Sequence, residues 1–246
     1  MIPPSPPSLP GLDVSAAYRP AGDGEEVGGD FYDIFQIASG DWVVAIGDVC
    51  GKGVEAAVVT ALVRYSLRAL SVQQEQPSEV LHALNDILVG QGTDRFCTVV
   101  LVRLRLDEEG WLATFASGGH PLPLHVSAAG VVRTVGETGS LIGVLAAITA
   151  QDSEVRLVPG DVLVMYTDGV TEGRHGAEFY GDERLEDAVR THRGTSRPAE
   201  RILGDVLDFQ AGTARDDIAV VAVRVPPLPS VPPQSSPPAR TNGVSP

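Results

Sequence analysis

Two kinds of hydrophobic pattern alternate along the chain. Short apolar runs, rich in Val and bounded by Gly, Asp or Pro, are typical of β-strands. They predict strands over 42–47, 96–106, 111–117, 161–167 and 218–225.

Between the first two predicted strands, apolar residues recur every three or four positions, which predicts an amphipathic helix. Its apolar stripe comprises Val54, Ala57, Val58, Ala61, Leu62 and Tyr65, with Arg64 and Arg68 elsewhere on the helical wheel. A second helix is predicted after Pro77, with Ser78 as its N-cap and a stripe of Val80, Leu81, Leu84, Ile87 and Leu88. Further helices are expected near 183–190 and 198–208. Strands in runs, with helices paired between them, favour an α+β layered domain over a doubly wound parallel sheet.

Both ends of the chain differ in composition from its middle. Five of the first ten residues are Pro, and Pro recurs from residue 226 onward. Such segments cannot bury enough apolar surface to fold. We therefore expect residues 1–12 and 226–246 to be disordered and residues 13–225 to form one domain. A Pro-rich tail can also bind SH3-like or WW-like domains, although a flexible tail is the simpler interpretation.

Composition limits the class of protein. Hydrophobic residues make up 43% of the 246 positions, and no apolar run reaches the roughly 20 residues that cross a bilayer, so we expect a soluble protein. The N-terminus lacks the features of a secretory signal, which favours the cytoplasm. Two cysteines form neither a disulfide framework nor a zinc cluster. A formal net charge of -14 disfavours nucleic acid and anionic membranes as partners.

The stretch GDVCGKG, residues 47–53, resembles a phosphate-binding loop at first sight. Such a loop needs four residues between its glycines and Ser or Thr after the lysine. Here three residues separate Gly47 from Gly51, and Gly53 follows Lys52. The spacing excludes a nucleotide loop and leaves an aspartate between glycines to be explained.

Acidic residues stand at the ends of the predicted strands. Asp30 lies just ahead of a strand, Asp48 and Asp168 close strands, and Asp216 with Asp217 opens the last one. Carboxylates that neighbouring strands bring together form an oxygen-rich site that suits Mg²⁺ or Mn²⁺ rather than Zn²⁺. A single Asp-Gly is more often a turn. The repetition of the pattern favours a metal site.

Five motifs then point to a family. VGGDFYD, GDVCGKGVEAA, SGGHPLPL, YTDGVTEGR and RDDIAVVAV, in this order, closely resemble the motifs of bacterial metal-dependent Ser/Thr protein phosphatases of the SpoIIE/RsbU type, a branch of the PPM or type 2C phosphatases. The resemblance covers residues 13–225. It implies a four-layer α-β-β-α sandwich with a two-metal centre, holding two Mn²⁺ or Mg²⁺ ions, at one edge. GDVCGKG is then a metal loop, whose glycines turn into a helix starting near Val54.

The resemblance also assigns the acidic residues. The metal site that it implies consists of Asp30, Asp48, the backbone carbonyl of Val49, Asp168, Asp216 and Asp217, of which Asp30, Asp48, Asp168 and Asp216 are the predicted catalytic residues. Asp48 would bridge both ions, Asp30 would be a second ligand or hold a water, and Asp217 would orient its neighbour. A hydroxide generated on the metals would attack phosphorus in line with the leaving oxygen, without a covalent intermediate.

The implied substrate is phosphoserine or phosphothreonine on a small regulatory protein, such as an anti-sigma-factor antagonist. Control would come from a separate activating partner or from a helix that moves to complete the metal site.

Several positions depart from the wider family. A His that often follows the bridging Asp is replaced by Cys50, which leaves water as the proton donor. We interpret His120 as structural and Cys97 as a core residue. Where the wider family has a phosphate-binding arginine, five residues before Asp30, this chain has Glu25. Lys52, Arg19 and Arg174 are candidates for that role, against the alternative of ordinary surface charge.

Three other functions fit the sequence less well. A catalytically weak PPM-fold binding module would be expected to lack some metal carboxylates, and all are present here. A serine hydrolase elbow within FASGGH needs Gly where Phe115 stands. A cyclase-like or nuclease metal enzyme is compatible with the carboxylates, but the acidic chain has no basic groove for nucleic acid.

Overall fold

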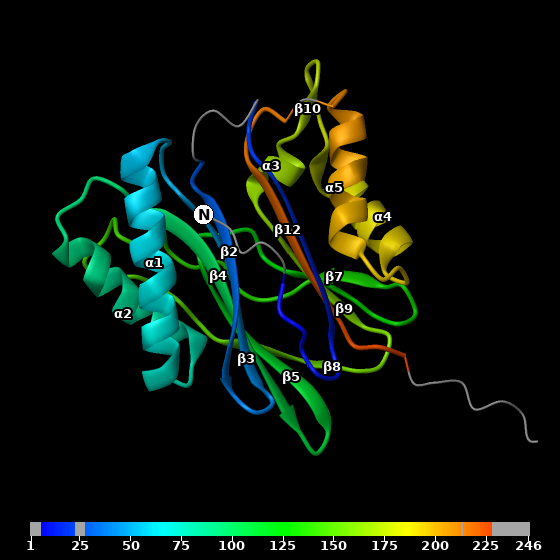
Figure 1. Ribbon diagram of the computed structural model, residues 1–246, viewed down its shortest axis with the longest axis horizontal. Coiled ribbons are helices and arrows are strands. Elements are labelled where there is room, and N and C mark those ends of the chain that lie inside the picture. The colour runs from blue at the N-terminus through cyan, green and yellow to red at the C-terminus, as the bar shows by residue number, and fades with distance from the viewer. Residues whose placement is uncertain (1–5, 23–27, 213, 228–246) are drawn as a thin grey trace, which may run out of the picture.

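The computed structural model describes residues 6–22, 28–212 and 214–227. Within them, two five-stranded antiparallel sheets pack face to face, and a pair of helices covers the outer face of each sheet (Figure 1). This is the α+β, four-layer α-β-β-α sandwich that the motifs imply.

The first sheet has the strand order β2-β3-β4-β5-β8 and lies under α1 and α2. Its elements are β2 (Asp30–Ala38), β3 (Asp41–Val49), α1 (Val54–Gln73), α2 (Pro77–Gly90), β4 (Cys97–Asp107), β5 (Gly110–Gly118) and β8 (Ser153–Leu157). Apolar side chains of the sheet and of the two helices, among them Leu101, Val63 and Leu84, form one core layer between them.

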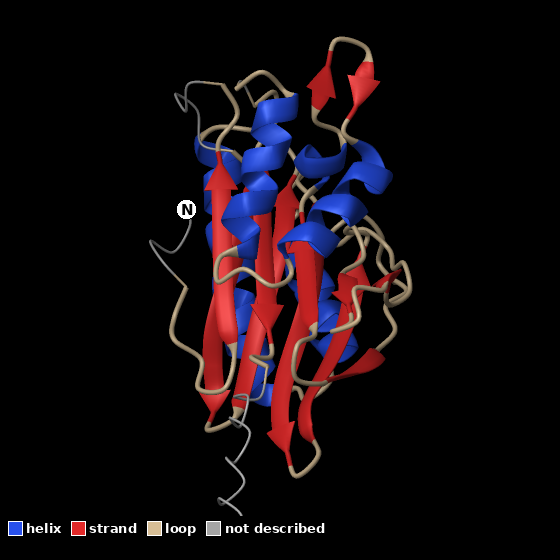
Figure 2. Cartoon of the chain, turned by 90° about the vertical axis from the view of Figure 1, so that its right-hand side faces the viewer, coloured by secondary structure: helices blue, strands red, loops and turns tan. Residues whose placement is uncertain are grey.

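The second sheet has the order β1-β12-β9-β6-β7 and lies under α4 and α5, which stand in front of it in Figure 2. Its elements are β1 (Asp13–Arg19), β6 (Leu124–Val126), β7 (Val132–Thr134), β9 (Val162–Tyr166), α4 (Gly181–His192), α5 (Pro198–Phe209) and β12 (Ile218–Arg224). The short helix α3 (Asp168–Thr171) and the hairpin of β10 (Arg174–His175) and β11 (Glu178–Phe179) follow β9. A central core layer, including Ile46, Val100 and Val221, joins the two sheets.

The five predicted strands and four predicted helices are all present, but the buried face of α1 differs from the prediction. Val54, Val58 and Tyr65 of the predicted stripe are exposed by 81%, 64% and 69%. The residues that face the sheet are Ala56, Val59, Thr60, Val63, Leu67 and Ser71. The helix is apolar on two faces, so periodicity identified the helix but not the face that packs.

The predicted cap of α2 is also wrong. The N-cap position is Gln76, and Ser78 lies inside the first turn. The Ser78 backbone N–H donates to Asp152 at 2.9 Å, and the Ser78 hydroxyl bonds the same carboxylate. Ser78 therefore ties the helix to the loop before β8 instead of capping its own backbone.

The packed chain starts earlier than predicted. Residues 1–12 were expected to be disordered, yet Leu9 and Leu12 are 3% and 5% exposed and belong to the core between the sheets. Two apolar side chains separated by a turn are sufficient to anchor this Pro-rich segment. Residues 1–5 and 228–246 lie outside the described residues. No helix in the described ranges is long and apolar enough to cross a membrane.

Candidate active site

The predicted acidic residues come together at one end of the sandwich. Asp30, the first residue of β2, is the register partner of Asp48 near the end of β3. In the other sheet, β9 ends just before Asp168, and β12 begins just after Asp216 and Asp217. Because β9 and β12 are antiparallel neighbours, the end of one and the start of the other lie at the same edge (Figure 1).

Asp30 is the most deeply buried carboxylate of this cluster. It is 3% exposed, its side chain is hydrogen-bonded to Thr167, and its Oδ2 has no partner among the described residues. Burial, reinforced by the charge of Asp48, holds the pKa of Asp30 well above its usual range. An acceptor oxygen without a donor is costly in a protein interior.

Asp48, Asp168 and Asp216 repel one another. Burial raises the pKa of Asp48 to about 6, and the charges of Asp168 and Asp216 add to the rise. The pKa of Asp168 is also raised, first by burial and then by Asp216. Lys52 partly offsets this repulsion, since its Nζ lies 3.9 Å from Asp216 Oδ1. The cluster thus holds more negative charge than its own cations neutralise.

Val49 presents its backbone oxygen beside Asp48. The Val49 N–H donates to the Gly29 carbonyl at 3.1 Å. A Cβ on Gly29 would lie 2.1 Å from the Val49 oxygen and 2.3 Å from Asp48 Oδ1. Only glycine permits this approach, which explains why a glycine precedes Asp30 in the motif.

Asp217 is held by donors from β1 and the segment that follows it. It is 5% exposed, its Oδ1 accepts the Ala21 N–H at 2.8 Å, and its side chain is hydrogen-bonded to Tyr18. Its own N–H donates to Asp216 Oδ1 at 2.9 Å. These contacts suit a residue that orients Asp216.

The chemistry of the cluster fits a hard divalent cation. Its donors are carboxylate and carbonyl oxygens, and Asp30 Oδ2 has no hydrogen-bond partner among the described residues. Burial and mutual repulsion raise the pKa values of Asp30 and Asp48, and a cation would offset both effects. Over the described ranges, no group of three or more His, Cys, Asp or Glu side chains is already arranged to hold a metal ion. The carboxylates therefore lie at one edge of the sandwich, but among the described residues their oxygens do not converge on a single ion position.

His120 and Cys97 are both buried, which agrees with their interpretation as structural and core residues. His120 is 2% exposed and lies with Nδ1 2.9 Å from Thr98 Oγ1 and Nε2 3.1 Å from the Tyr166 carbonyl. Since a carbonyl only accepts, Nε2 carries the proton and Nδ1 accepts from Thr98. Burial lowers the pKa of His120 to about 3, so it is neutral near pH 7. Cys97 is fully buried, whereas Cys50 is partly exposed.

The candidate phosphate-binding cations differ in position. Lys52 and Arg174 lie at the site edge, and Arg174 lines a cavity of about 200 Å³ together with Asp216. Arg215 lines the same cavity, and sequence reasoning missed it although it directly precedes Asp216 in the RDD motif. Arg19 is an exposed residue at the end of β1, and Glu25 lies outside the described residues.

Comparison with known proteins agrees with the motifs. The family described as stage II sporulation protein E (SpoIIE) matches residues 38–226. The chain is 28% identical to protein IcfG of Synechocystis, over 90% of this chain and 39% of IcfG. It is 27% identical to phosphoserine phosphatase RsbU of Bacillus subtilis, over 87% of this chain and 63% of RsbU. It therefore spans less than two thirds of either relative.

A solved structure shows the same fold. The PP2C phosphatase domain of SpoIIE from Bacillus subtilis, solved with a fragment of its regulatory domain, superposes with a TM-score of 0.74 at 23% identity, covering 87% of this chain and 62% of the other. With residues 38–226 matched by the family and the sandwich shared, this chain belongs to the SpoIIE family of bacterial PPM phosphatases.

Proposed function

We propose that this protein is a metal-dependent protein serine/threonine phosphatase. The observation that carries the proposal is the cluster around Asp30 and Asp48, in which the buried Asp30 and the half-buried Asp48 repel each other and Asp30 Oδ2 has no partner among the described residues. A bound cation would reduce the repulsion between the carboxylates and would provide a partner for that oxygen. The relative RsbU is named a phosphoserine phosphatase, which supports the reaction class.

The cofactor in this proposal is a pair of Mn²⁺ or Mg²⁺ ions. Asp48 would bridge them, with Asp168, Asp216 and the Val49 carbonyl as further ligands. Such ions lower the pKa of water and neutralise phosphoryl oxygens. The protein supplies the framework: Gly29 keeps the Val49 and Asp48 oxygens close to the backbone of β2, and Asp217 orients Asp216.

Asp30 completes the proposed site from the buried side, as a second ligand or by holding a water. Its Thr167 hydrogen bond fixes one side of the carboxylate and leaves Oδ2 for the ion or its water. Asp168 and Asp216 are exposed residues, so their side chains have the freedom to turn toward a bound ion.

Arg174 and Arg215 are the proposed contacts for the substrate phosphate. They line one cavity with Asp216 and Glu172, so an anion there would meet two guanidinium groups beside the metal ligands. Arg174 also stacks on Phe179, with its guanidinium carbon 4.0 Å from the ring centroid, which limits its freedom. Arg174→Ala and Arg215→Ala should each raise KM for a phosphopeptide more than they change metal affinity.

The proposed substrate is phosphoserine or phosphothreonine on a regulatory protein such as an anti-sigma-factor antagonist, acting in the cytoplasm. A separate activating partner is part of the proposal. The alternative is a catalytically weak PPM-fold module that binds a partner. The full set of carboxylates at the site favours the enzyme.

The test is hydrolysis of a phosphoserine peptide and of p-nitrophenyl phosphate by the purified chain, with Mn²⁺ or Mg²⁺ and with excess chelator. Metal-dependent phosphate release that chelator abolishes is the expected result. Calorimetric titration with Mn²⁺ accompanies the assay. Mn²⁺ binding without release would favour a requirement for the activating partner, whereas neither binding nor release would reject the enzyme in favour of the binding module.

A further inference from the structure

We propose that Arg95 is a positioning residue that fixes the metal loop, defined here as Cys50–Gly53 between β3 and α1. The proposal rests on the proposed function, because the loop directly follows the expected ligands Asp48 and Val49. Sequence reasoning gave Arg95 no role, since it lies in the segment between α2 and β4, more than forty residues along the chain.

The backbone of Cys50 is held on both sides by this segment. Arg95 Nη1 donates to the Cys50 carbonyl at 2.8 Å, and the Cys50 N–H donates to the Phe96 carbonyl at 2.9 Å. The peptide between Val49 and Cys50, which contains the expected ligand oxygen of Val49, is held by the Phe96 carbonyl. Arg95 holds the next peptide, between Cys50 and Gly51, so it limits how far the Val49 peptide can rotate from the loop side.

The turn after Cys50 is shaped to receive the guanidinium. Gly51 has a φ of +102°, and a Cβ at this position would lie 1.5 Å from Arg95 Nη1. A side chain at residue 51 would therefore displace Arg95 or break the turn. Gly29 packs closely against the Val49 oxygen, so the stretch from Val49 to Gly51 has a close glycine contact at its start and an arginine contact at its end.

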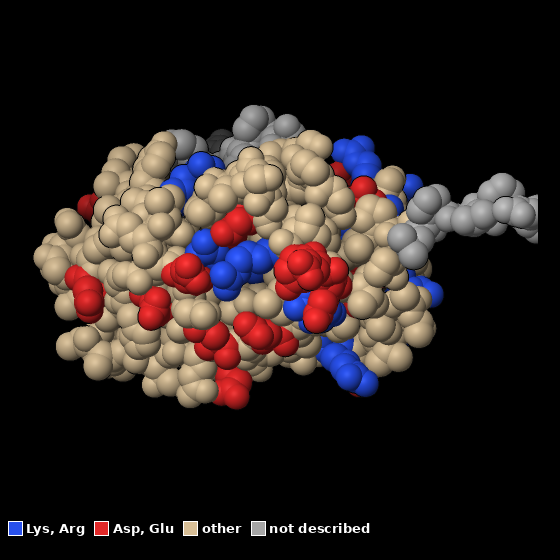
Figure 3. All heavy atoms as spheres, turned by 90° about the horizontal axis from the view of Figure 1, so that it is seen from below, with Lys and Arg blue, Asp and Glu red and all other residues tan. Residues whose placement is uncertain are grey.

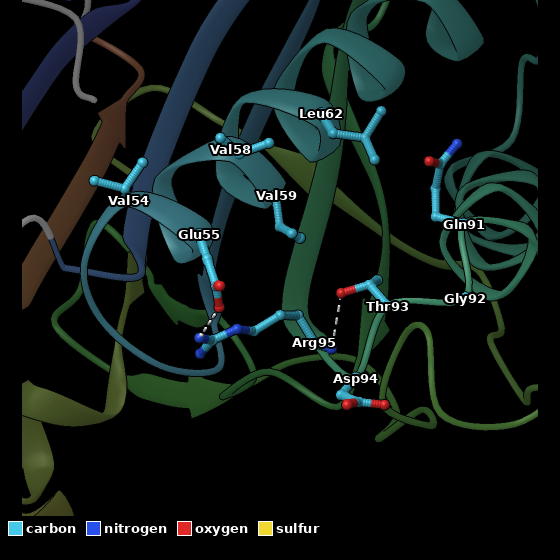
Figure 4. A pocket seen from close by; sticks show the side chains of 10 residues that line it. All are labelled: Val54, Glu55, Val58, Val59, Leu62, Gln91, Gly92, Thr93, Asp94 and Arg95. Atoms are coloured by element: carbon cyan, nitrogen blue, oxygen red, sulfur yellow. Dashed lines mark hydrogen bonds and ion pairs between the residues drawn. The ribbon is translucent and has the colours of Figure 1, made fainter.

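Arg95 also reaches the first turn of α1. Its Nη2 lies 3.1 Å from Glu55 Oε2, and its own N–H donates to Thr93 Oγ1 at 3.1 Å, as Figure 4 shows. These residues line a groove of about 560 Å³ beside the exposed Val54 and Val58. One guanidinium thus links the metal loop, the start of α1 and the segment before β4.

The two contacts of the Arg95 guanidinium, with Glu55 and with Cys50, differ in strength. The Glu55 side chain is 84% exposed, so this ion pair is worth little alone. The hydrogen bond to Cys50 is part-buried, and Arg95 itself is 27% exposed. Charge-assisted bonds to a backbone carbonyl are stronger than neutral ones. The hydrogen bond to the Cys50 carbonyl therefore holds the metal loop in place, and the ion pair with Glu55 orients the guanidinium. A lysine has a point charge instead of a planar fork and would replace only one of the two contacts.

Cys50 itself gives a readout that needs neither metal nor activity. The sequence contains two cysteines, and Cys97 is fully buried, so alkylation of the folded protein reports on Cys50. The experiment compares wild type with Arg95→Ala, Arg95→Lys and Glu55→Gln. Arg105→Ala is the matched control, because Arg105 is also part-exposed and pairs with an exposed glutamate, Glu75, at the far end of β4.

Two quantities are measured: the iodoacetamide alkylation rate in excess chelator, and the Mn²⁺ dissociation constant by calorimetry. Arg95→Ala should speed alkylation severalfold and weaken Mn²⁺ binding about tenfold or more, as loss of an outer-shell partner does. Both quantities for Arg95→Lys should lie between those of Arg95→Ala and wild type. Glu55→Gln should raise the alkylation rate and the Mn²⁺ dissociation constant slightly, and Arg105→Ala should leave both at the wild-type values.

The outcomes separate this proposal from the proposed function. Arg95→Ala with wild-type alkylation and Mn²⁺ affinity would overturn the positioning role alone. If Arg95→Ala does not fold, Arg95→Lys decides, and wild-type values for it in both measurements would overturn the role. A wild-type protein that binds no Mn²⁺ would reject the metal site and this proposal with it.

Discussion

Carboxylates at the two ends of the β2–β3 hairpin have opposite electrostatic surroundings. The strands pair in register from Asp30 and Asp48 at one end to Ala38 and Asp41 at the other. At the turn end, Asp41 accepts two bonds from Arg103, at 2.9 and 2.6 Å. Figure 3 views this lower end of the molecule, where acidic and basic side chains are interspersed. At the Asp30 end, burial and then acidic neighbours raise the pKa of both aspartates.

The contrast appears even within one strand. Asp33, three residues after Asp30, is 1% exposed, yet Arg68 donates to both of its oxygens at 2.7 Å and Arg64 lies at 3.4 Å. Burial of a carboxylate therefore does not mark a functional site. What distinguishes Asp30 is burial without a matched cation, which costs stability unless a ligand supplies the charge.

The largest expected effect follows from removing the proposed bridge. Asp48→Asn should lower kcat/KM for a phosphoserine peptide by at least about a thousandfold, since metal ions contribute several kcal/mol to such transition states. Its melting temperature in chelator should not fall, because the substitution removes a repelling charge. Steady-state kinetics and thermal unfolding check the two halves. Activity within tenfold of wild type would refute the metal assignment.

The opposite behaviour is expected at Asp33. Asp33→Asn should lower the free energy of unfolding by about 3 kcal/mol, because Arg64 and Arg68 would lose their buried partner. Urea denaturation measures the loss. An Asp33 variant as stable as wild type would remove the distinction between paired and unpaired carboxylates in β2.

A pH series sharpens the comparison. The folded pKa of Asp48 is about 6, above the usual value of 3.8, so the folded state holds this proton more tightly than the unfolded state. Its contribution to stability is full below pH 3.8 and is lost as pH rises through 6. In excess chelator, Asp48→Asn should therefore gain stability relative to wild type from pH 4 to pH 7. A constant difference between the two proteins would contradict the raised pKa.

The smallest effect is expected for an exposed pair outside the site. Glu75→Gln should change the free energy of unfolding by less than about 0.5 kcal/mol, because its partner Arg105 lies 3.5 Å away on an open surface. The same urea experiment measures it. A loss as large as that of Asp33→Asn would mean that burial does not decide the strength of these pairs.

Particular residues show which features of the site and the fold could be predicted from the sequence. The apolar strand pattern placed Asp48, Asp168 and Asp216 at the ends of predicted strands, and the structure brings them to one edge. The roles proposed for Arg95 and Arg215 rest only on their neighbours in space. Periodicity assigned the wrong face to α1, because Val58 and Val59 are equally apolar and only packing buries one of them.

The sequence by itself predicted five of the strands, the four long helices, the layered class and the candidate acidic residues, because periodicity and residue spacing act locally along the chain. Tertiary structure decided which carboxylates receive an arginine. Asp30 and Asp33 are the same residue type in one apolar strand, but Arg64 and Arg68 on α1 reach Asp33, whereas Asp30 faces Asp48 and Asp217. Charge pairing depends on distance in space, and short-range patterns in a sequence do not encode that distance.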